Sequence, residues 1–324
     1  MSQPSPPIAD TGGGAPEPPP TSSPHPPPSA RPTHPWTAWL ELLRAGNLLT
    51  IASNALVGWA IGTQASPDHR FALATVAVMA LYAAGMVFND VCDARIDARE
   101  RPARPIPSGR VESQTALLVV AVLFATALAL LAPTSHAAVG AGGVLIALIV
   151  MYDLLHARSA LSVILMAACR MMVYVVVACA APVPGGWPLP MSTTFALAGA
   201  LGIFVVGLSL VARLEASTQG GLAGARRAAP LLLIVPPLLP VVVLRAPPWW
   251  VVVLAVPMLA WILLGARHAL AAPPRRGAAV RTWIAAIPLI DAFFLGLLGR
   301  PALAVIAVAC WLATVLAHRR VAAT

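Results

Sequence analysis

Residues 88–110 read FNDVCDARIDARERPARPIPSGR, and three of the 12 acidic residues of the chain, Asp90, Asp93 and Asp97, lie here within eight positions. On a helix, positions three and four apart share a face, so these aspartates and Asn89 project together. Like charges at this spacing repel one another, whereas a bound divalent cation would hold them. Mg²⁺ is typically bound by one or two carboxylates plus substrate phosphates. The stretch therefore predicts Asn89, Asp90, Asp93 and Asp97 as ligands of Mg²⁺.

Two arginines of the same stretch, Arg101 and Arg104, follow the acids among prolines that break a helix and hold an extended loop. Guanidinium groups bind phosphate oxygens through paired hydrogen bonds. Acids suited to a metal and arginines suited to phosphate thus lie side by side. A solvated loop with internal salt bridges is the alternative interpretation, but it explains the charges and not the alignment of the acids.

Outside this stretch the chain is strongly apolar. Hydrophobic residues make up 59% of the 324 positions, charged residues make up 10%, and the mean hydropathy is +0.81. A water-soluble domain carries about 25% charged residues, so that class of protein is excluded. Ten apolar runs of roughly 16–21 residues are long enough to cross a bilayer, and only Gly299 and Arg300 separate the last two. We expect an all-α integral membrane protein with a bundle of nine to ten transmembrane helices. The runs lie near 46–63, 71–88, 115–132, 138–152, 161–181, 193–211, 228–244, 249–266, 281–298 and 301–317.

Two parts of the chain differ in composition. Residues 1–35 are rich in Pro, Ser and Gly and cannot bury a core, so we expect a disordered tail. Residues 36–320 form the predicted transmembrane domain. It begins with an amphipathic segment, Trp36–Arg44, whose tryptophans suit the membrane interface.

The basic residues predict the orientation. All 21 of them are arginine, and the formal net charge is +9. Most lie in alternate connections between the apolar runs, including the connection that follows the acids, and cytoplasmic loops retain such residues. We expect a multi-pass protein of the cell (plasma) membrane, with the N-terminus and the acidic stretch in the cytoplasm. This explanation of the charge requires no nucleic acid partner.

The acidic stretch resembles the signature of the UbiA superfamily of intramembrane prenyltransferases, Asn-Asp-x-x-Asp-x-x-x-Asp followed by Arg-x-x-Arg-Pro-x-x-x-Gly. The matching residues are Asn89, Asp90, Asp93, Asp97, Arg101, Arg104, Pro105 and Gly109. The resemblance implies a helical bundle around a central cavity. There Mg²⁺ links the acidic motif to a prenyl diphosphate, and the prenyl group passes to a lipophilic acceptor, often an aromatic ring. By this resemblance Asp90, Asp93, Asp97 and Arg104 are catalytic, while Asn89 and Arg101 bind substrate.

The chain departs from the family at the second acidic motif, which is commonly Asp-x-x-x-Asp. Residues 209–217 read SLVARLEAS and hold Arg213 and Glu215 instead. In one interpretation Glu215 ligates a metal, or Arg213 contacts phosphate as a fixed charge. In the other, the two residues form an ion pair at the membrane boundary. One-metal and two-metal mechanisms both stay open.

A third position, after the fourth apolar run, usually brings a tyrosine and a basic residue in the family. Here Tyr152 matches, and His156 or Arg158 takes the basic role in substrate binding. Asp153 either supplies a further carboxylate or pairs with Arg158. A tyrosine at the membrane interface beside a local ion pair is the alternative.

Polar residues inside the apolar runs are further candidates. Asn47 and Asn54 lie seven positions apart on one predicted helix face, and an asparagine of this helix helps to hold substrate in the family. An interhelical hydrogen bond is the alternative, and we favour substrate binding for Asn47. Arg170 and Asp291 are unfavourable in lipid. They either pair with each other, pair with Glu215, or line the cavity.

The segments Gly46–Asn54, Cys169–Arg170 and Pro288–Asp291 resemble the EboC-like branch of the superfamily, which implies no particular acceptor. The sequence as a whole predicts a Mg²⁺-dependent prenyltransferase. The alternative is a non-catalytic or transport-related protein of the same fold that handles a small metabolite. The altered segment 209–217 favours this alternative, and the complete first motif opposes it.

Overall fold

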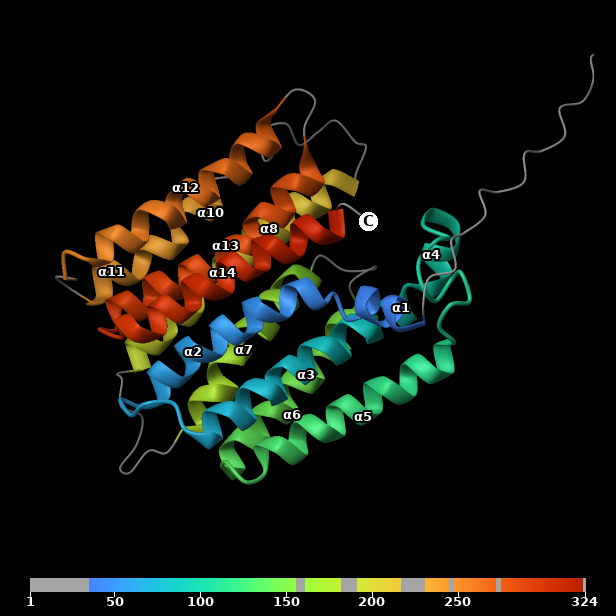
Figure 1. Cartoon of the computed structure of the whole chain (residues 1–324), viewed down its shortest axis with the longest axis horizontal. Helices are drawn as coiled ribbons and strands as arrows, with labels where there is room; N and C mark the ends of the chain where they lie inside the picture. Colours follow the sequence, from blue (N-terminus) through green and yellow to red (C-terminus); the bar gives the residue numbers. More distant parts are fainter. Residues whose placement is uncertain are drawn as a thin grey trace, which may run out of the picture. The chain divides into compact units, whose positions relative to one another are not determined.

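The computed structural model describes residues 35–155, 161–181, 191–216, 231–244, 248–271 and 275–322. Of the predicted tail at residues 1–35, residues 1–34 lie outside these ranges and Pro35 begins the first helix. Throughout the described ranges every regular element is a helix (Figure 1). The prediction of an all-α protein is confirmed.

The long helices follow the apolar runs of the sequence, and short helices lie between them. In chain order the helices are α1 (Pro35–Leu42), η1 (Ala45–Asn47), α2 (Leu48–Gly62), α3 (His69–Cys92), α4 (Ala94–Glu100), α5 (Ser113–Leu131), α6 (His136–Leu155), α7 (Ser162–Ala180), α8 (Met191–Ala216), α10 (Leu231–Ile234), η3 (Pro236–Leu238), α11 (Leu239–Leu244), α12 (Val251–Leu270), α13 (Arg276–Leu297) and α14 (Pro301–Ala322).

Within the described ranges, eight helices are long and apolar enough to cross a membrane, namely α3, α5, α6, α7, α8, α12, α13 and α14. They account for all but two of the predicted apolar runs. The run near 46–63 forms α2, which has 15 residues. The run near 228–244 is divided into α10, η3 and α11. Pro236 and Pro237 lie at this division. They interrupt the helix, because proline lacks the backbone N–H that a continuous helix requires.

The last two apolar runs form separate helices, α13 and α14, joined by a tight turn at residues 298–300. Gly299 has a φ of +69°, in the left-handed region that glycine adopts without steric strain. The turn reverses the chain, so that α13 and α14 pack along each other (Figure 1).

Two apolar cores share the helices α2 and α7. One core joins them to α3, α5 and α6, and the other joins them to α8, α12, α13 and α14 (Figure 1). Gly58 and Gly62 allow α2 to approach α7 closely. A β-carbon at Gly58 would lie 2.7 Å from the carbonyl oxygen of Tyr174, and one at Gly62 would lie 2.5 Å from that of Ala178. Small residues four apart produce such close packing between membrane helices.

The outward faces of several helices are apolar. Large aliphatic side chains on α5, α12 and α14 are exposed, among them Leu118, Val253 and Val305. Water disfavours apolar surfaces of this extent, whereas lipid accepts them. With the eight candidate spans, these surfaces identify a multi-pass membrane protein.

Candidate active site

The acidic stretch begins in the last turn of α3 and continues into α4. The two helices meet at Asp93, but helical hydrogen bonds continue across it. Asp93 N donates to Asn89 O at 2.9 Å, and Asp97 N donates to Asp93 O at 2.9 Å. The backbone therefore keeps the spacing that places these three residues on one side of the helix. As the prolines predict, α4 ends before Pro102.

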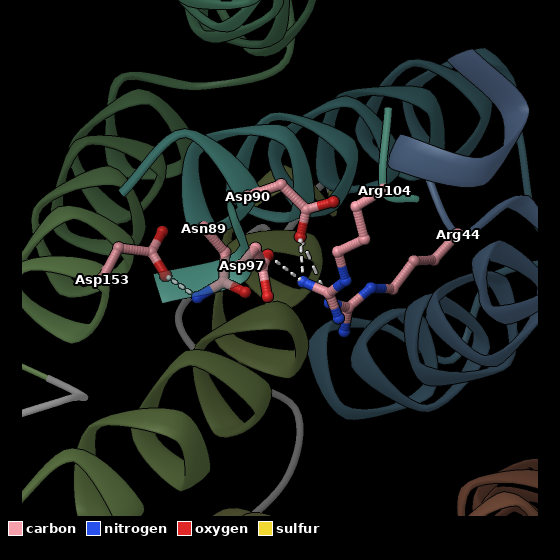
Figure 2. Close-up of polar contacts among 6 residues, drawn as sticks. All are labelled: Arg44, Asn89, Asp90, Asp97, Arg104 and Asp153. Carbon is pink, nitrogen blue, oxygen red and sulfur yellow. Dashed lines mark hydrogen bonds and ion pairs between the residues drawn. The ribbon is translucent and has the colours of Figure 1, made fainter. Parts of the chain in front are cut away.

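Arg104 joins two of the aspartates. Its Nη1 donates to Asp97 Oδ2 at 2.6 Å and to Asp90 Oδ1 at 3.4 Å (Figure 2). Arg44 Nη2 approaches the same oxygen of Asp90 at 3.4 Å. Asp90 and Asp97 are only 7% and 4% exposed. Two buried carboxylates so close together repel each other, and the two arginines offset that repulsion.

Asn89 is directed to a different carboxylate. Its Nδ2 donates to Asp153 Oδ1 at 3.1 Å, and this bond connects α3 to α6 (Figure 2). Asp153 is buried. The structure therefore places Asp153 beside the acidic stretch. Arg158, its predicted ion-pair partner, lies outside the described residues, so both predictions for Asp153 stay open.

A cavity of about 210 Å³ adjoins these residues. Side chains of α2, α3, α6, α7, α8 and α13 line it, and most of them are apolar. Its charged and hydrogen-bonding side chains are Arg44, Asn47, Thr50, Tyr82, Tyr152, Asp153 and Arg170. Arg44 contacts Asp90, and Asp153 contacts Asn89. The cavity therefore has a polar part next to the acidic stretch and an apolar part away from it.

The other predicted residues of this region differ in position. Asn47 and Tyr152 line the cavity. Asn47 is also held by α14, because His318 Nε2 lies 2.7 Å from its Oδ1. Asp93 is half-buried at the junction of α3 and α4. Arg101 is exposed and does not join the contacts that Arg104 makes.

Four predicted substrate-binding residues are not placed by the structure. His156 and Arg158 lie outside the described residues. Arg213 and Glu215 belong to the last turns of α8, and their side chains lie outside the described part of the chain.

The carboxylates of Asp90 and Asp97 fit a divalent cation. Mg²⁺ prefers hard oxygen ligands and needs only one or two carboxylates when substrate phosphates complete its shell. Both carboxylates converge on one position, where Arg104 Nη1 lies. Over the described ranges, no three His, Cys, Asp or Glu side chains come together as a metal site. The role of Asn89 as a metal ligand stays a prediction, because its bond to Asp153 uses the amide nitrogen and a metal would bind the amide oxygen.

Arg170 and Asp291, which the sequence marks as unusual in lipid, form no ion pair with each other. Asp291 is completely buried. It accepts hydrogen bonds from Ser53 Oγ at 2.6 Å, Asn54 Nδ2 at 2.8 Å and the Tyr174 hydroxyl at 2.5 Å. These bonds connect α13 to α2 and α7, so Asn54 has the interhelical role that was the alternative to substrate binding.

Sequence analysis did not single out Thr50, Ser53, Tyr174 or His318. Serine and threonine are weak signals in an apolar run, because they bond to the backbone of their own helix. Thr50 Oγ1 donates to Asn47 O at 2.7 Å, and Ser53 Oγ approaches Thr50 O at 3.0 Å. The phenol of Tyr174, in the middle of an apolar run, was the stronger available signal.

Comparison with known proteins adds a family and a fold. The family model described as the UbiA prenyltransferase family matches residues 51–296. Among curated relatives, the digeranylgeranylglyceryl phosphate synthase of Sulfolobus acidocaldarius is 35% identical over 122 residues, which are 38% of this chain and 43% of the relative. The synthase of Methanopyrus kandleri is 41% identical over 88 residues, 27% of this chain and 32% of the relative. The matches span less than half the length of these relatives.

Solved structures match over more of the chain. The apo structure of a UbiA homologue from Aeropyrum pernix K1 has a TM-score of 0.64 at 19% identity, over 76% of this chain and 96% of that one. A UbiA homologue from Archaeoglobus fulgidus, bound to GPP and Mg²⁺, has a TM-score of 0.58 at 15% identity, over 81% and 99% of the two chains. At these identities the likeness establishes the fold.

Proposed function

The chain belongs to the UbiA prenyltransferase family, and we propose that it is an intramembrane enzyme that transfers an isoprenoid group from a prenyl diphosphate to a lipophilic acceptor. The observation that supports the proposal most directly is the convergence of Asp90, Asp97, Arg104 and Arg44 beside the cavity. The apolar part of the cavity suits an isoprenoid chain, and its polar part suits a diphosphate.

The diphosphate is bound by positive charge and hydrogen-bond donors. Arg44 and Arg104 donate to phosphate oxygens, and the Tyr152 hydroxyl and Asn47 amide add neutral donors from the cavity wall. Mg²⁺ held by Asp90 and Asp97, with Asn89 and Asp93 nearby, would neutralise charge on the departing diphosphate. The structures of a UbiA homologue from Archaeoglobus fulgidus bound to GPP and Mg²⁺ and to DMAPP and Mg²⁺ support this class of donor and this cofactor.

Transfer begins when the bond between the allylic carbon and the diphosphate oxygen breaks, and both electrons leave with the diphosphate. Arg44 and Arg104 stabilise that developing charge. The acceptor attacks the allylic cation, forms the new bond and then loses a proton. Apolar lining residues such as Leu81, Ile149 and Val173 exclude water, which would otherwise capture the cation.

We assign the remaining predicted substrate contacts to the same diphosphate. Arg101 follows α4 and approaches a bound diphosphate from the exposed loop. His156 and Arg158 follow α6, Arg213 lies in the last turns of α8, and Glu215 in the same turns would ligate a metal ion that the diphosphate binds. Except for Arg101, these residues lie close in sequence to the end of a membrane-spanning helix, which supports this assignment.

We place the protein in the plasma membrane. The distribution of its arginines supports an orientation in which the N-terminus and the acidic stretch face the cytoplasm. The diphosphate would then enter from the cytoplasm, and the isoprenoid chain and acceptor from the lipid. Cysteine labelling in intact cells tests this orientation through single cysteines placed in the exposed turn at Gln64 and in the exposed loop at Arg101. We expect only the cysteine at position 101 to be protected from an impermeant reagent.

The activity is tested with purified full-length protein in lipid vesicles, supplied with Mg²⁺, a series of labelled prenyl diphosphates and a lipid extract of the native host. We expect release of pyrophosphate and one labelled adduct, whose mass identifies both substrates.

The same vesicles distinguish an enzyme from a transport-related protein. Passage of an unaltered prenyl diphosphate across the vesicle membrane, with neither adduct nor pyrophosphate release, would contradict the proposal. The absence of turnover together with the absence of Mg²⁺-dependent pyrophosphate binding would contradict it as well.

A further inference from the structure

Arg170 is a cation inside the membrane-spanning part of the bundle, and the acidic stretch does not account for it. It lies in α7, lines the cavity, and donates from Nη2 to Thr50 Oγ1 at 2.6 Å. A guanidinium group carries five N–H donors. The bond to Thr50 is the one hydrogen bond that Arg170 makes among the described residues. Most of its donors are therefore available to a ligand in the cavity.

Arg170 forms no ion pair with a carboxylate in the described ranges. Asp291 is close enough to interact with it electrostatically. However, Asp291 already accepts hydrogen bonds from Ser53, Asn54 and Tyr174, and no carboxylate in the described ranges lies within 4.0 Å of Arg170. A buried cation is usually retained through a paired carboxylate. Among the described residues, Arg170 instead uses a single donor, on Thr50, and its other donors have no hydrogen-bond partner there.

Thr50 connects Arg170 to the polar part of the cavity. Thr50 Oγ1 donates to Asn47 O at 2.7 Å, so the guanidinium group lies against the same turn that carries Asn47 and Arg44. Arg44 contacts Asp90 at 3.4 Å. The α2 and α7 side of the cavity therefore carries a cation, and the α3 side adjoins the carboxylates that fit Mg²⁺.

We propose that Arg170 binds the diphosphate group of the prenyl donor, as a fixed positive charge on the side of the cavity formed by α2 and α7. Thr50 is a positioning residue that holds the guanidinium group through its hydroxyl. The inference rests on the proposed function, because it takes the prenyl diphosphate as the ligand. It adds a contact that does not depend on the metal.

The test is the binding of inorganic pyrophosphate to the full-length protein in detergent, measured by calorimetry with and without Mg²⁺. We expect Arg170→Gln to raise the Kd for pyrophosphate on the order of tenfold in both conditions, as for the loss of charge-assisted hydrogen bonds. Arg267→Gln, which changes an exposed arginine of α12, should leave the Kd unchanged. Thr50→Val should raise it by a smaller factor.

Two results would overturn the inference while the proposed function stands. One is wild-type affinity for pyrophosphate in folded Arg170→Gln. The other applies if that variant does not fold, and it is wild-type affinity in folded Arg170→Met, which has neither the charge nor the donors. Failure of the wild-type protein to bind pyrophosphate in either condition would instead contradict the proposed function.

Discussion

His318 Nε2 lies 2.7 Å from Asn47 Oδ1, although 271 positions separate the two residues. The contact joins the last turns of α14 to η1, at the edge of the cavity that Asn47 lines. The contact engages the amide oxygen of Asn47, so the amide nitrogen can donate a hydrogen bond to a ligand. The position of a proposed substrate contact is thus set by the far end of the chain.

We expect His318→Ala to weaken substrate binding without removing catalysis. Loss of one hydrogen bond of about 1 kcal/mol allows Asn47 to leave its position, so the KM for the prenyl diphosphate should rise about fivefold with little change in kcat. Steady-state kinetics measure this separation. His136→Ala, at an exposed position of α6, is the matched control. An equal fall in kcat for both histidine variants would contradict the assigned role.

Asp90→Asn should lower kcat by roughly 10²–10³-fold, because the amide removes a negative charge from the proposed metal site. Chelation of Mg²⁺ should abolish wild-type turnover, and added Mg²⁺ should restore it. The matched control is Glu100→Gln, an exposed acid at the end of α4. The test is the rate of pyrophosphate release by the wild type and by both variants, measured at a series of Mg²⁺ concentrations. Full activity of Asp90→Asn at ordinary Mg²⁺ concentrations would rule out its role as a ligand.

Arg104→Gln removes the cation that Asp90 and Asp97 share. We expect a loss of kcat on the order of 10²-fold, since the departing diphosphate loses a charged donor. Because the two carboxylates then face each other without the arginine, Mg²⁺ should bind the substrate-free protein more tightly. Calorimetry with Mg²⁺ alone tests this second effect. Arg99→Gln, an exposed arginine of α4, should change neither quantity, and weaker Mg²⁺ binding by Arg104→Gln would contradict the argument.

Asp291→Ala should destabilise the bundle by several kcal/mol. The carboxylate accepts bonds from Ser53, Asn54 and Tyr174, and each donor left unsatisfied in the interior costs about 1–3 kcal/mol. The thermal unfolding midpoint in detergent measures the effect, with Glu100→Gln as the exposed acidic control. An unchanged midpoint would show that water or a rearranged helix satisfies all three donors.

Gly62→Ala and Gly143→Ala should change stability in opposite directions. A β-carbon at Gly62 would lie 2.5 Å from a backbone oxygen of α7, which forces the helices apart. No atom lies within 4 Å of a β-carbon at Gly143 in α6, where alanine gains up to about 1 kcal/mol of helix propensity. Unfolding midpoints of the two variants, compared with the wild type, test this difference. Equal stability of both would exclude close packing between α2 and α7.

Features that depend on local spacing could be predicted from the sequence. Helical hydrogen bonds continue across Asp93, so the spacing of Asn89, Asp93 and Asp97 already placed them on one side of the backbone. The apolar runs predicted the long helices for the same reason. The division of the run near 228–244 could also have been predicted, because Pro236 and Pro237 are adjacent. Treating that run as one helix gave hydrophobicity too much weight and the missing backbone donors too little.

Contacts between distant helices could not be predicted in this way. The pattern predicts Asn89 as a metal ligand, but it gave no indication that the amide nitrogen of Asn89 donates to Asp153 of α6. Arg170 and Asp291 were recognised as unusual, but their spacing in sequence contains no information on whether they touch. Three neutral donors satisfy Asp291 instead. Which of several polar groups a buried carboxylate selects depends on helix packing, and a single sequence does not specify it.

The bonds to Asp291 also have a consequence for biosynthesis. Ser53 and Tyr174 precede Asp291 by 238 and 117 positions. A ribosome makes the chain from its N-terminus, so both donors are inserted into the membrane long before their acceptor is made. α2 and α7 can meet early through their glycine contacts, but their polar groups have no carboxylate partner until α13 is inserted. The polar contacts that join α2 and α7 to α13 therefore form late in the assembly of the bundle.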